Sequence, residues 1–206
     1  MNDTKNSTKK VGRPKKFNRD EALTAAMSVF WKRGFDGASM KNLTDAMGIN
    51  GPSLYAEFGD KEALYKSAID CYASNDACAP LVAFETEPNI EDAVRAFFTA
   101  AINYASDHES GARGCFLASS VATTAGCVEG VDELLCKAIL DTDHRLAFRL
   151  QSAIDKGELP PTFPALERAR LMFDLRQGFV FRARAGLSAD AMMADIDQRV
   201  RVVLAE

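Results

Sequence analysis

Apolar residues recur along most of the chain at spacings of three and four positions, which is the period of an amphipathic α-helix. We find no segment with the apolar–polar alternation of a half-buried strand, so we expect an all-α protein. The predicted helices cover residues 19–32, 40–47, 52–58, 61–75, 90–107, 115–124, 131–156, 165–185 and 188–205. The predicted loops between the later helices cover residues 80–89, 109–114, 126–130 and 157–164.

Residues 40–58 are bounded and divided by residues that start and end helices, which predicts two short helices joined by a tight turn. Ser39 is a good N-cap for the first helix, and Gly48 is suited to end it. Pro52 fits the first turn of the second helix, because its missing N–H is not needed there. Leu54 and Phe58 fall on the opposite side and are expected in the core. This pattern is typical of a helix-turn-helix, whose second helix enters the major groove of DNA.

Charge is segregated along the chain, although the net charge is only −4. Residues 1–66 hold twelve bases and eight acids, whereas residues 67–206 hold thirteen bases and twenty-one acids. A basic front on an acidic body is expected when one end meets a polyanion. Residues 1–16 should form a disordered basic arm, in which Arg13 stands in a Gly-Arg-Pro sequence like that of minor-groove hooks. A merely solubilising tail is the alternative.

An ordered set of residues in this basic front resembles one family of DNA-binding proteins. The set comprises Ala26, Phe30, Gly34, Phe35, Ser39, Met40, Lys41, Asn42, Leu43, Ala46, Met47, Gly48, Ile49, Leu54, Tyr55, Phe58, Lys61, Glu62, Ala63 and Leu64. At these positions, residues 17–66 resemble the TetR family of helix-turn-helix transcriptional regulators without gaps. The resemblance implies a three-helix DNA-binding domain over residues 17–66 and a C-terminal helical bundle for effector binding and dimerisation over residues 67–206. It also implies a homodimer in which helices 165–185 and 188–205 form a four-helix interface.

The resemblance assigns DNA contacts to the second and third helices. The implied DNA-binding residues are Ser39, Met40, Lys41, Asn50, Gly51, Pro52, Ser53, Tyr55 and Lys61, with Arg13 added from the arm. Small residues at the front of a recognition helix let its backbone approach base edges. Glu57 departs from the family pattern, and we place it at the rim because phosphates would repel a carboxylate. A two-fold protein of this kind is expected to bind a palindromic operator.

The resemblance also implies a small-molecule pocket among the middle helices, which makes a repressor released by a ligand the expected function. The candidate lining residues are Phe97, Phe98, Tyr104, Phe116, Ser120, His144, Phe148, Phe173 and Gln177. Aromatic residues at helical spacing are equally typical of plain core, so both interpretations stay open.

The five cysteines include no C-x-x-C pair, which argues against a disulfide framework and a thiolate zinc site. With only two histidines, we expect no metal and no cofactor. Cys71 and Cys78 would lie about 10.5 Å apart on a continuous helix, too far to be bridged, and are expected in the core. Cys115 follows Arg113 at a helix start, where a thiolate is stabilised. A regulator that senses electrophiles or oxidants through this thiol is therefore the alternative.

Other classes of function find little support. No apolar run approaches the roughly eighteen residues of a membrane span. The polar, basic start lacks the apolar segment of a secretory signal, so we expect a cytoplasmic protein. No G-x-S-x-G, H-E-x-x-H, P-loop or dinucleotide turn is present, so we expect no enzyme. A nucleoid-type protein that binds any duplex is a further rival, but the acidic body argues against it.

Overall fold

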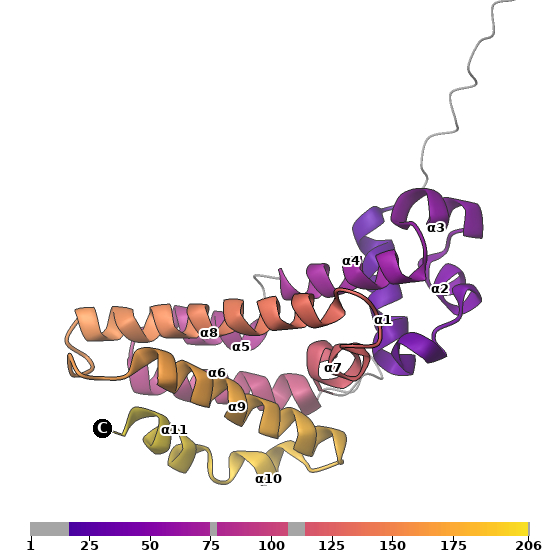
Figure 1. The fold of residues 1–206 in the computed structure, drawn as a ribbon. Helices are drawn as coiled ribbons and strands as arrows, with labels where there is room; N and C mark the ends of the chain where they lie inside the picture. Colours follow the sequence, from indigo (N-terminus) through magenta and orange to yellow (C-terminus); the bar gives the residue numbers. More distant parts are fainter. Residues whose placement is uncertain (1–16, 75–77, 107–113, 206) are drawn as a thin grey trace, which may run out of the picture.

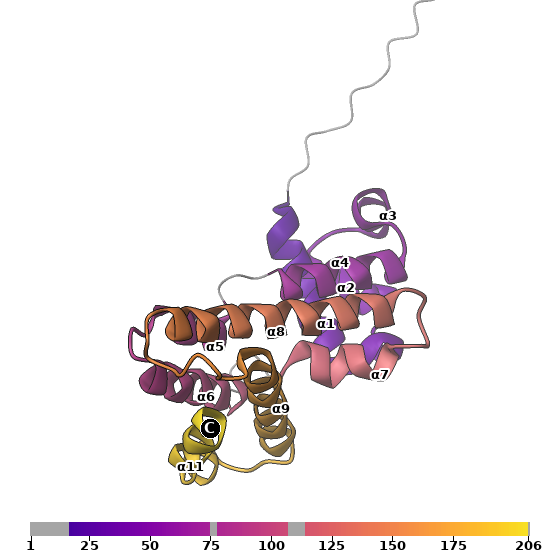
Figure 2. The ribbon, with the colours of Figure 1, turned by 60° about the vertical axis from the view of Figure 1, so that its left-hand side comes forward.

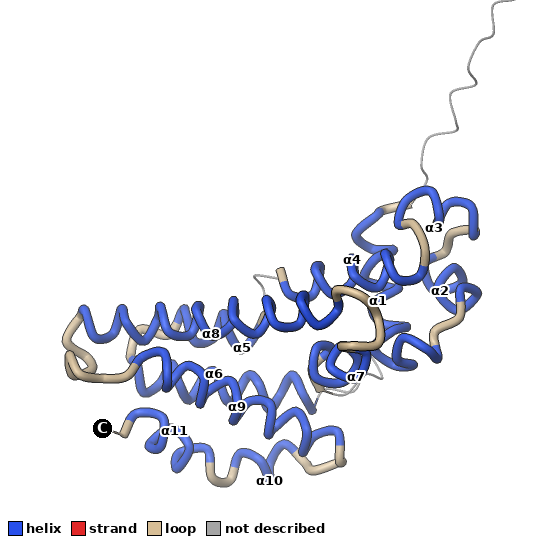
Figure 3. Tube along the Cα trace, viewed as in Figure 1, coloured by secondary structure: helices blue, strands red, loops and turns tan. Residues whose placement is uncertain are grey.

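The computed structural model describes residues 17–74, 78–106 and 114–205, and every regular element in these ranges is helical (Figures 1 and 3). The elements are α1 (Arg19–Gly37), α2 (Met40–Met47), α3 (Gly51–Phe58), α4 (Lys61–Ala73), α5 (Ala79–Thr86), α6 (Ile90–Ser106), the π-helical turn η1 (Leu117–Val121), α7 (Ala122–Thr124), α8 (Val131–Asp155), α9 (Ala165–Arg184), α10 (Ala189–Met193) and α11 (Ile196–Leu204). The expected basic arm of residues 1–16, with Arg13, lies outside the described residues.

Helices α1 to α3 form one end of the molecule, and α4 leads from this end into the remainder (Figure 1). We call residues 17–66 the head and residues 67–205 the body. The head is built on α1, which packs against both α2 and α4. Phe30, Leu43 and Leu54 are fully buried between these helices.

The body is a bundle in which the long helices α8 and α9 pack together and against α5 and α6 (Figures 1 and 2). Helices α10 and α11 lie on the outside of α6. Phe97 and Phe98 of α6 and Phe179 of α9 are almost completely buried at the centre, where their rings meet edge to face. The predicted all-α fold with a helix-turn-helix end is confirmed.

Two predictions about the body are wrong. The predicted loop over residues 80–89 contains helix α5, because Pro80 stands in its first turn and Leu81 and Phe84 are buried against α6. The single helix predicted over residues 188–205 is two short helices, α10 and α11. Apolar side chains of both helices, such as Met192 and Val203, are buried within the same protomer.

The ends of the head helices agree closely with the sequence prediction. Helix α2 has the predicted bounds, and α3 begins at Gly51, one residue before the predicted start. The element α1 extends to Gly37, but its regular helix is interrupted at Gly34, whose φ of 71° lies outside the helical region. This interruption agrees with the predicted end of the first helix near residue 32.

Candidate DNA-binding site

Side chains cap the N-termini of the two helices that form the candidate site. The Asn50 carboxamide oxygen accepts a hydrogen bond of 2.9 Å from the Ser53 amide at the start of α3. The Ser39 hydroxyl oxygen accepts from the Asn42 amide at 3.1 Å, and Asn42 accepts from the Ser39 amide at 3.2 Å. Each cap leaves other first-turn amides free to donate to an anion. Asn50 and Ser39 therefore shape the two helix starts that the sequence assigned to DNA.

The turn between α2 and α3 depends on Gly48. Its φ of 65° lies in the left-handed region, where a side chain is disfavoured. The amide of Ile49 donates to the Thr44 carbonyl at 3.2 Å and closes the end of α2. This turn sets the angle at which α3 leaves α2, which is the geometry a recognition helix needs.

The outer face of α3 presents small residues and one large ring. Tyr55 is 56% exposed, whereas the other aromatic side chains of the head are buried or half-buried. Pro52 is exposed, and a Cβ built onto Gly51 meets no atom within 4 Å, so the front of α3 faces open space. Leu54 and Phe58 on the inner face are buried, which confirms their prediction as core. The helix therefore has one face bound to the head and one free for a partner.

The charged residues around α3 differ in whether their side chains are exposed or are held by contacts within the head. Lys41 is exposed on α2, whereas the Lys61 ammonium lies 4.4 Å from the centre of the Phe35 ring. Glu57 does not stand at the rim. Its carboxylate pairs with the Arg19 guanidinium at 3.4 Å, and only 12% of its side chain is exposed. The carboxylate is thus neutralised on the α1 side of α3, which removes the repulsion expected from the sequence.

A buried polar junction joins the head to the body. The Tyr65 hydroxyl of α4 lies 3.1 Å from the Ser120 hydroxyl and 3.3 Å from the Thr124 hydroxyl. Ser120 donates to the Phe30 carbonyl of α1 at 3.2 Å, which leaves Tyr65 as the donor to Ser120. Ser120, a predicted ligand-binding residue, therefore ties the π-helical turn η1 to both α1 and α4.

The predicted ligand-binding residues do not converge on one cavity. Phe97 lines an enclosed cavity of about 40 Å³, and Phe173 and Gln177 line an apolar groove of about 300 Å³ between α8, α9 and η1. His144 and Phe148 line an open groove of about 710 Å³ between α5 and α8, where Phe148 is 78% exposed.

The remaining predicted ligand-binding residues make contacts in the core or near its edge. Phe98 is fully buried, and its ring lies 5.7 Å from that of Phe179. Phe116 is fully buried, and its ring lies 5.7 Å from that of Trp31. Tyr104 is 40% exposed beside Trp31. Phe98 therefore packs inside the body, whereas Phe116 and Tyr104 pack against Trp31 of the head.

Sequence reasoning missed Arg176, a buried arginine of α9 that is only 7% exposed. Its guanidinium lies near Cys115, whose sulfur accepts from the Tyr72 hydroxyl at 3.3 Å. Burial opposes the charge of Arg176, but Cys115, Tyr72 and Cys78 outweigh it and raise the pKa of Arg176. Burial, reinforced by Cys115, raises the pKa of Tyr72.

A signal for Arg176 was present in the sequence. Arg176 lies four residues after Met172 and three before Phe179, so it interrupts the apolar stripe that α9 turns inward. A charge on a buried stripe needs partners, and here these are a thiol and a phenol. Cys115 itself is fully buried at the start of the segment that contains η1.

Two further observations limit the chemistry of the described residues. In the ranges 17–74, 78–106 and 114–205, no group of three or more His, Cys, Asp or Glu side chains is placed to hold a metal ion. No helix within these ranges is long and apolar enough to cross a membrane.

The sequence also matches known proteins over both the head and the body. The model for "Bacterial regulatory proteins, tetR family" matches residues 22–68, and that for "Tetracyclin repressor-like, C-terminal domain" matches residues 91–197. The HTH-type transcriptional repressor ComR of Escherichia coli K12 is 31% identical over 186 residues, which cover 90% of this chain and 88% of ComR. The uncharacterized HTH-type transcriptional regulator YezE of Bacillus subtilis 168 is 31% identical over 194 residues, or 94% of this chain and 100% of YezE.

A solved structure gives the same result. A cysteine mutant of the TetR family transcriptional regulator CifR, complexed with 26-bp double-strand operator DNA, matches with a TM-score of 0.82 and 28% identity. The match covers 92% of this chain and 98% of the CifR chain. The chain therefore belongs to the TetR family of DNA-binding transcriptional regulators, which are not enzymes.

Proposed function

We propose that the chain is a homodimeric repressor that binds a palindromic operator through α3 and is released by a small molecule. The observation that carries this proposal is the free outer face of α3, with Gly51, Pro52 and Ser53 at its front and Tyr55 beside them. ComR is described as a repressor, and CifR is bound to operator DNA in its solved complex, which supports the same role for this chain.

In this proposal each part of the site has its own task. Gly51, Pro52, Ser53 and Tyr55 meet base edges, and the capped helix starts at Ser39 and Asn50 direct amides toward phosphates. Met40, Lys41, Lys61 and the arm with Arg13 complete the list of proposed DNA contacts. Lys61 is able to leave the Phe35 ring, because a partly exposed cation–π contact is worth only about 0.5–1 kcal/mol.

The dimer interface that we propose uses α8 and α9. Phe148 of α8 and Phe181 of α9 are 78% and 75% exposed, and Leu140 of α8 is also exposed. Large exposed apolar side chains on neighbouring helices mark an interaction surface, and a two-fold copy of α8 and α9 would make four helices. The interface expected from the sequence included residues 188–205, but α10 and α11 use their apolar faces on α6.

The effector site that we propose is the apolar groove between α8, α9 and η1. Besides Phe173, it is lined by Gln177, whose side-chain oxygen is buried without a hydrogen-bond partner. Such an acceptor suits a ligand that carries a donor on an apolar body. Leu117 of η1 also lines the groove, and Ser120 in the same turn is bonded to the head. A ligand that displaces η1 would therefore shift α1 and α4, and with them α3.

Operator binding tests the main proposal. We expect saturable binding to a palindromic site, measured by fluorescence anisotropy, with at least about a thousandfold preference over a scrambled duplex. Equal binding to both duplexes would contradict the proposal and favour a nucleoid-type protein. Deletion of residues 1–16 should lower both the affinity and its salt dependence, and unchanged values would leave the arm as a solubilising tail.

A second candidate function, release by an electrophile, is favoured by the surroundings of Cys115. The Tyr72 hydroxyl donates to this sulfur, and the guanidinium of Arg176 lies nearby, so the thiol stands among polar groups in the interior. Addition to an activated alkene would form a C–S bond, with the thiol proton ending on the alkene carbon. Because Cys115 is fully buried next to Phe116, the added group would push apart the packing between head and body.

The two candidates differ in one experiment. If the thiol is the sensor, N-ethylmaleimide should release operator DNA from the unmodified protein but not from Cys115→Ser, while Cys136→Ser on the exposed face of α8 should behave as the parent. Release that persists in Cys115→Ser would dismiss the thiol mechanism.

A further inference from the structure

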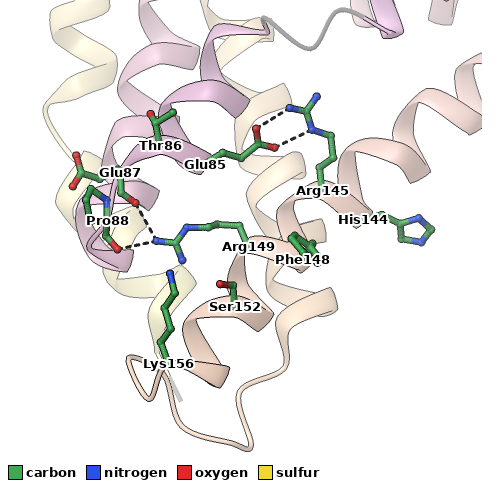
Figure 4. Close-up of a pocket in the computed structure, with 10 residues that line it drawn as sticks. All are labelled: Glu85, Thr86, Glu87, Pro88, His144, Arg145, Phe148, Arg149, Ser152 and Lys156. Atoms are coloured by element: carbon green, nitrogen blue, oxygen red, sulfur yellow. Dashed lines mark hydrogen bonds and ion pairs between the residues drawn. The ribbon is translucent and has the colours of Figure 1, made fainter.

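A groove between α5 and α8 lies away from both the recognition helix and the proposed effector site. It has a volume of about 710 Å³ and receives side chains from the end of α5 and from the second half of α8 (Figure 4). Pockets for small organic ligands have volumes of about 300–1,000 Å³. The groove is therefore large enough for a ligand, and its chemistry depends on the charges along its wall.

A buried arginine forms the floor at one end. Arg149 is only 8% exposed, and its Nη2 donates to the carbonyls of Glu87 and Pro88, both at 3.0 Å. These bonds and the nearby Phe84 ring, 5.9 Å from the guanidinium carbon, hold the group in place. The other terminal nitrogen, Nη1, is buried and has no hydrogen-bond partner. A buried charged donor without a hydrogen-bond partner raises the free energy of the folded state, so binding of an acceptor at this atom would be favourable.

A second cation stands next to Arg149. The Lys156 side chain points toward the guanidinium, and Ser152 lies between the two on α8 (Figure 4). Lys156 is exposed, so its flexible side chain is able to move aside while Arg149 stays fixed. Two like charges that face one another repel each other unless an anion lies between them.

The carboxylates of the groove are directed elsewhere. Glu85 makes two hydrogen bonds of 2.9 Å with Arg145, to Nε and to Nη2. The Glu87 carboxylate points away from Arg149, although its backbone carbonyl accepts from that residue (Figure 4). No lining carboxylate therefore lies between Arg149 and Lys156.

We propose that this end of the groove binds the carboxylate of a small organic acid. The free Nη1 of Arg149 would donate to one carboxylate oxygen, and Lys156 and Ser152 would supply further donors. The organic body would extend along α8 toward Phe148, where the groove meets the proposed dimer face. The bound acid would link the end of α5 to α8. This inference is independent of the proposed operator binding and of the α8–α9–η1 groove.

Calorimetric titration of the full-length protein with sodium benzoate, at constant ionic strength, tests the proposal. We expect saturable binding that is weakened about tenfold or more in Lys156→Gln, because a charge-assisted hydrogen bond is lost. Lys137→Gln, an exposed lysine of the same helix outside the groove, is the matched control and should bind like the parent. Inorganic phosphate serves as the second probe, and we expect it to bind more weakly than benzoate.

Arg149→Lys tests the fixed cation separately, because it keeps the charge but loses the Nη1 donor that the bonds to Glu87 and Pro88 hold in place. We expect a loss of benzoate affinity at least as large as that of Lys156→Gln, with a circular dichroism spectrum like that of the parent. If Arg149→Lys does not fold, Lys156→Gln decides alone, since Lys156 is exposed. Absence of saturable benzoate binding, equal affinity in Lys156→Gln, or tighter binding of phosphate would overturn the proposal.

Discussion

The head and the body differ in the distance along the chain over which their structure is determined. In the head, Ser39, Asn50 and Asp60 each cap an amide three residues later. In the body, Arg149 binds the carbonyl of Glu87, which lies 62 residues away. The helix starts of the head are therefore fixed by residues close together in the sequence. The sites of the body form only when helices that are far apart in the sequence pack together.

This difference fits the separate tasks of the two regions. A surface that reads DNA must keep one shape, and capped short helices around a small core provide it. A sensing region must be able to adopt more than one conformation, and polar contacts between helices that are distant in the sequence can be exchanged when a ligand binds. The Tyr65–Ser120 junction lies between the two, because it joins α4 to a π-helical turn, an element common at functional sites.

The largest expected effect comes from the core of the head. Leu54→Ala removes a fully buried side chain and should destabilise by about 2–5 kcal/mol, as should Leu150→Ala in the body. Hydrogen exchange should show that Leu54→Ala loses protection mainly over residues 40–58, and Leu150→Ala mainly in α8 and α9. Equal loss of protection throughout in both variants would show that head and body unfold as one unit.

Operator contact should be sensitive to Tyr55 without loss of stability. Tyr55→Ala is expected to weaken operator binding by about 1–3 kcal/mol if the ring meets a base, with an unchanged free energy of unfolding because the side chain is exposed. Val202→Ala, an exposed residue of α11, is the control. Tyr55→Phe separates the ring from the hydroxyl. An unchanged dissociation constant for Tyr55→Ala would remove the residue from the site.

The contrast between the regions also explains how much could be predicted from the sequence. The caps Ser39 and Asn50, the turn at Gly48 and the buried Leu54 follow from rules that reach three or four residues along the chain. The position of the Glu57 carboxylate did not follow from these rules, because its partner Arg19 lies on another helix. The helices, caps and core positions of the head were therefore predicted from local rules, whereas the ion pair between Arg19 and Glu57 was not.

In the body, helix periodicity predicted most elements but not what their side chains meet. The sequence predicted a loop over residues 80–89, but Pro80 occupies the first turn of helix α5, where proline is tolerated. Aromatic spacing did not separate Phe98, which packs in the core, from Phe173, which lines a groove. Only the fold brings Arg176 to Cys115, and periodicity shows no more than a charge on a buried stripe.

The junction should give a smaller effect. Tyr65→Phe keeps the buried ring but removes the donor to Ser120, and should lower the free energy of unfolding by about 0.5–1.5 kcal/mol. Ser67→Ala is the matched control, because its hydroxyl bonds only to the Ala63 carbonyl within α4. Urea unfolding of both variants measures the difference. If Tyr65→Phe is no less stable than Ser67→Ala, the polar junction does not hold the head on the body.

The smallest effect should be electrostatic and confined to the head. Lys61→Ala should reduce the slope of the logarithm of operator affinity against the logarithm of salt concentration by about 0.9, because one phosphate contact is lost. Lys137→Ala in the body should leave the slope unchanged, since that lysine pairs with Asp141 far from α3. An unchanged slope for Lys61→Ala would mean that Lys61 stays on the Phe35 ring when DNA binds. The positive excess of residues 1–66, which lies in the basic arm, would then act through that arm and Lys41, and the reading surface would be narrower than the set of residues that the sequence assigned to it.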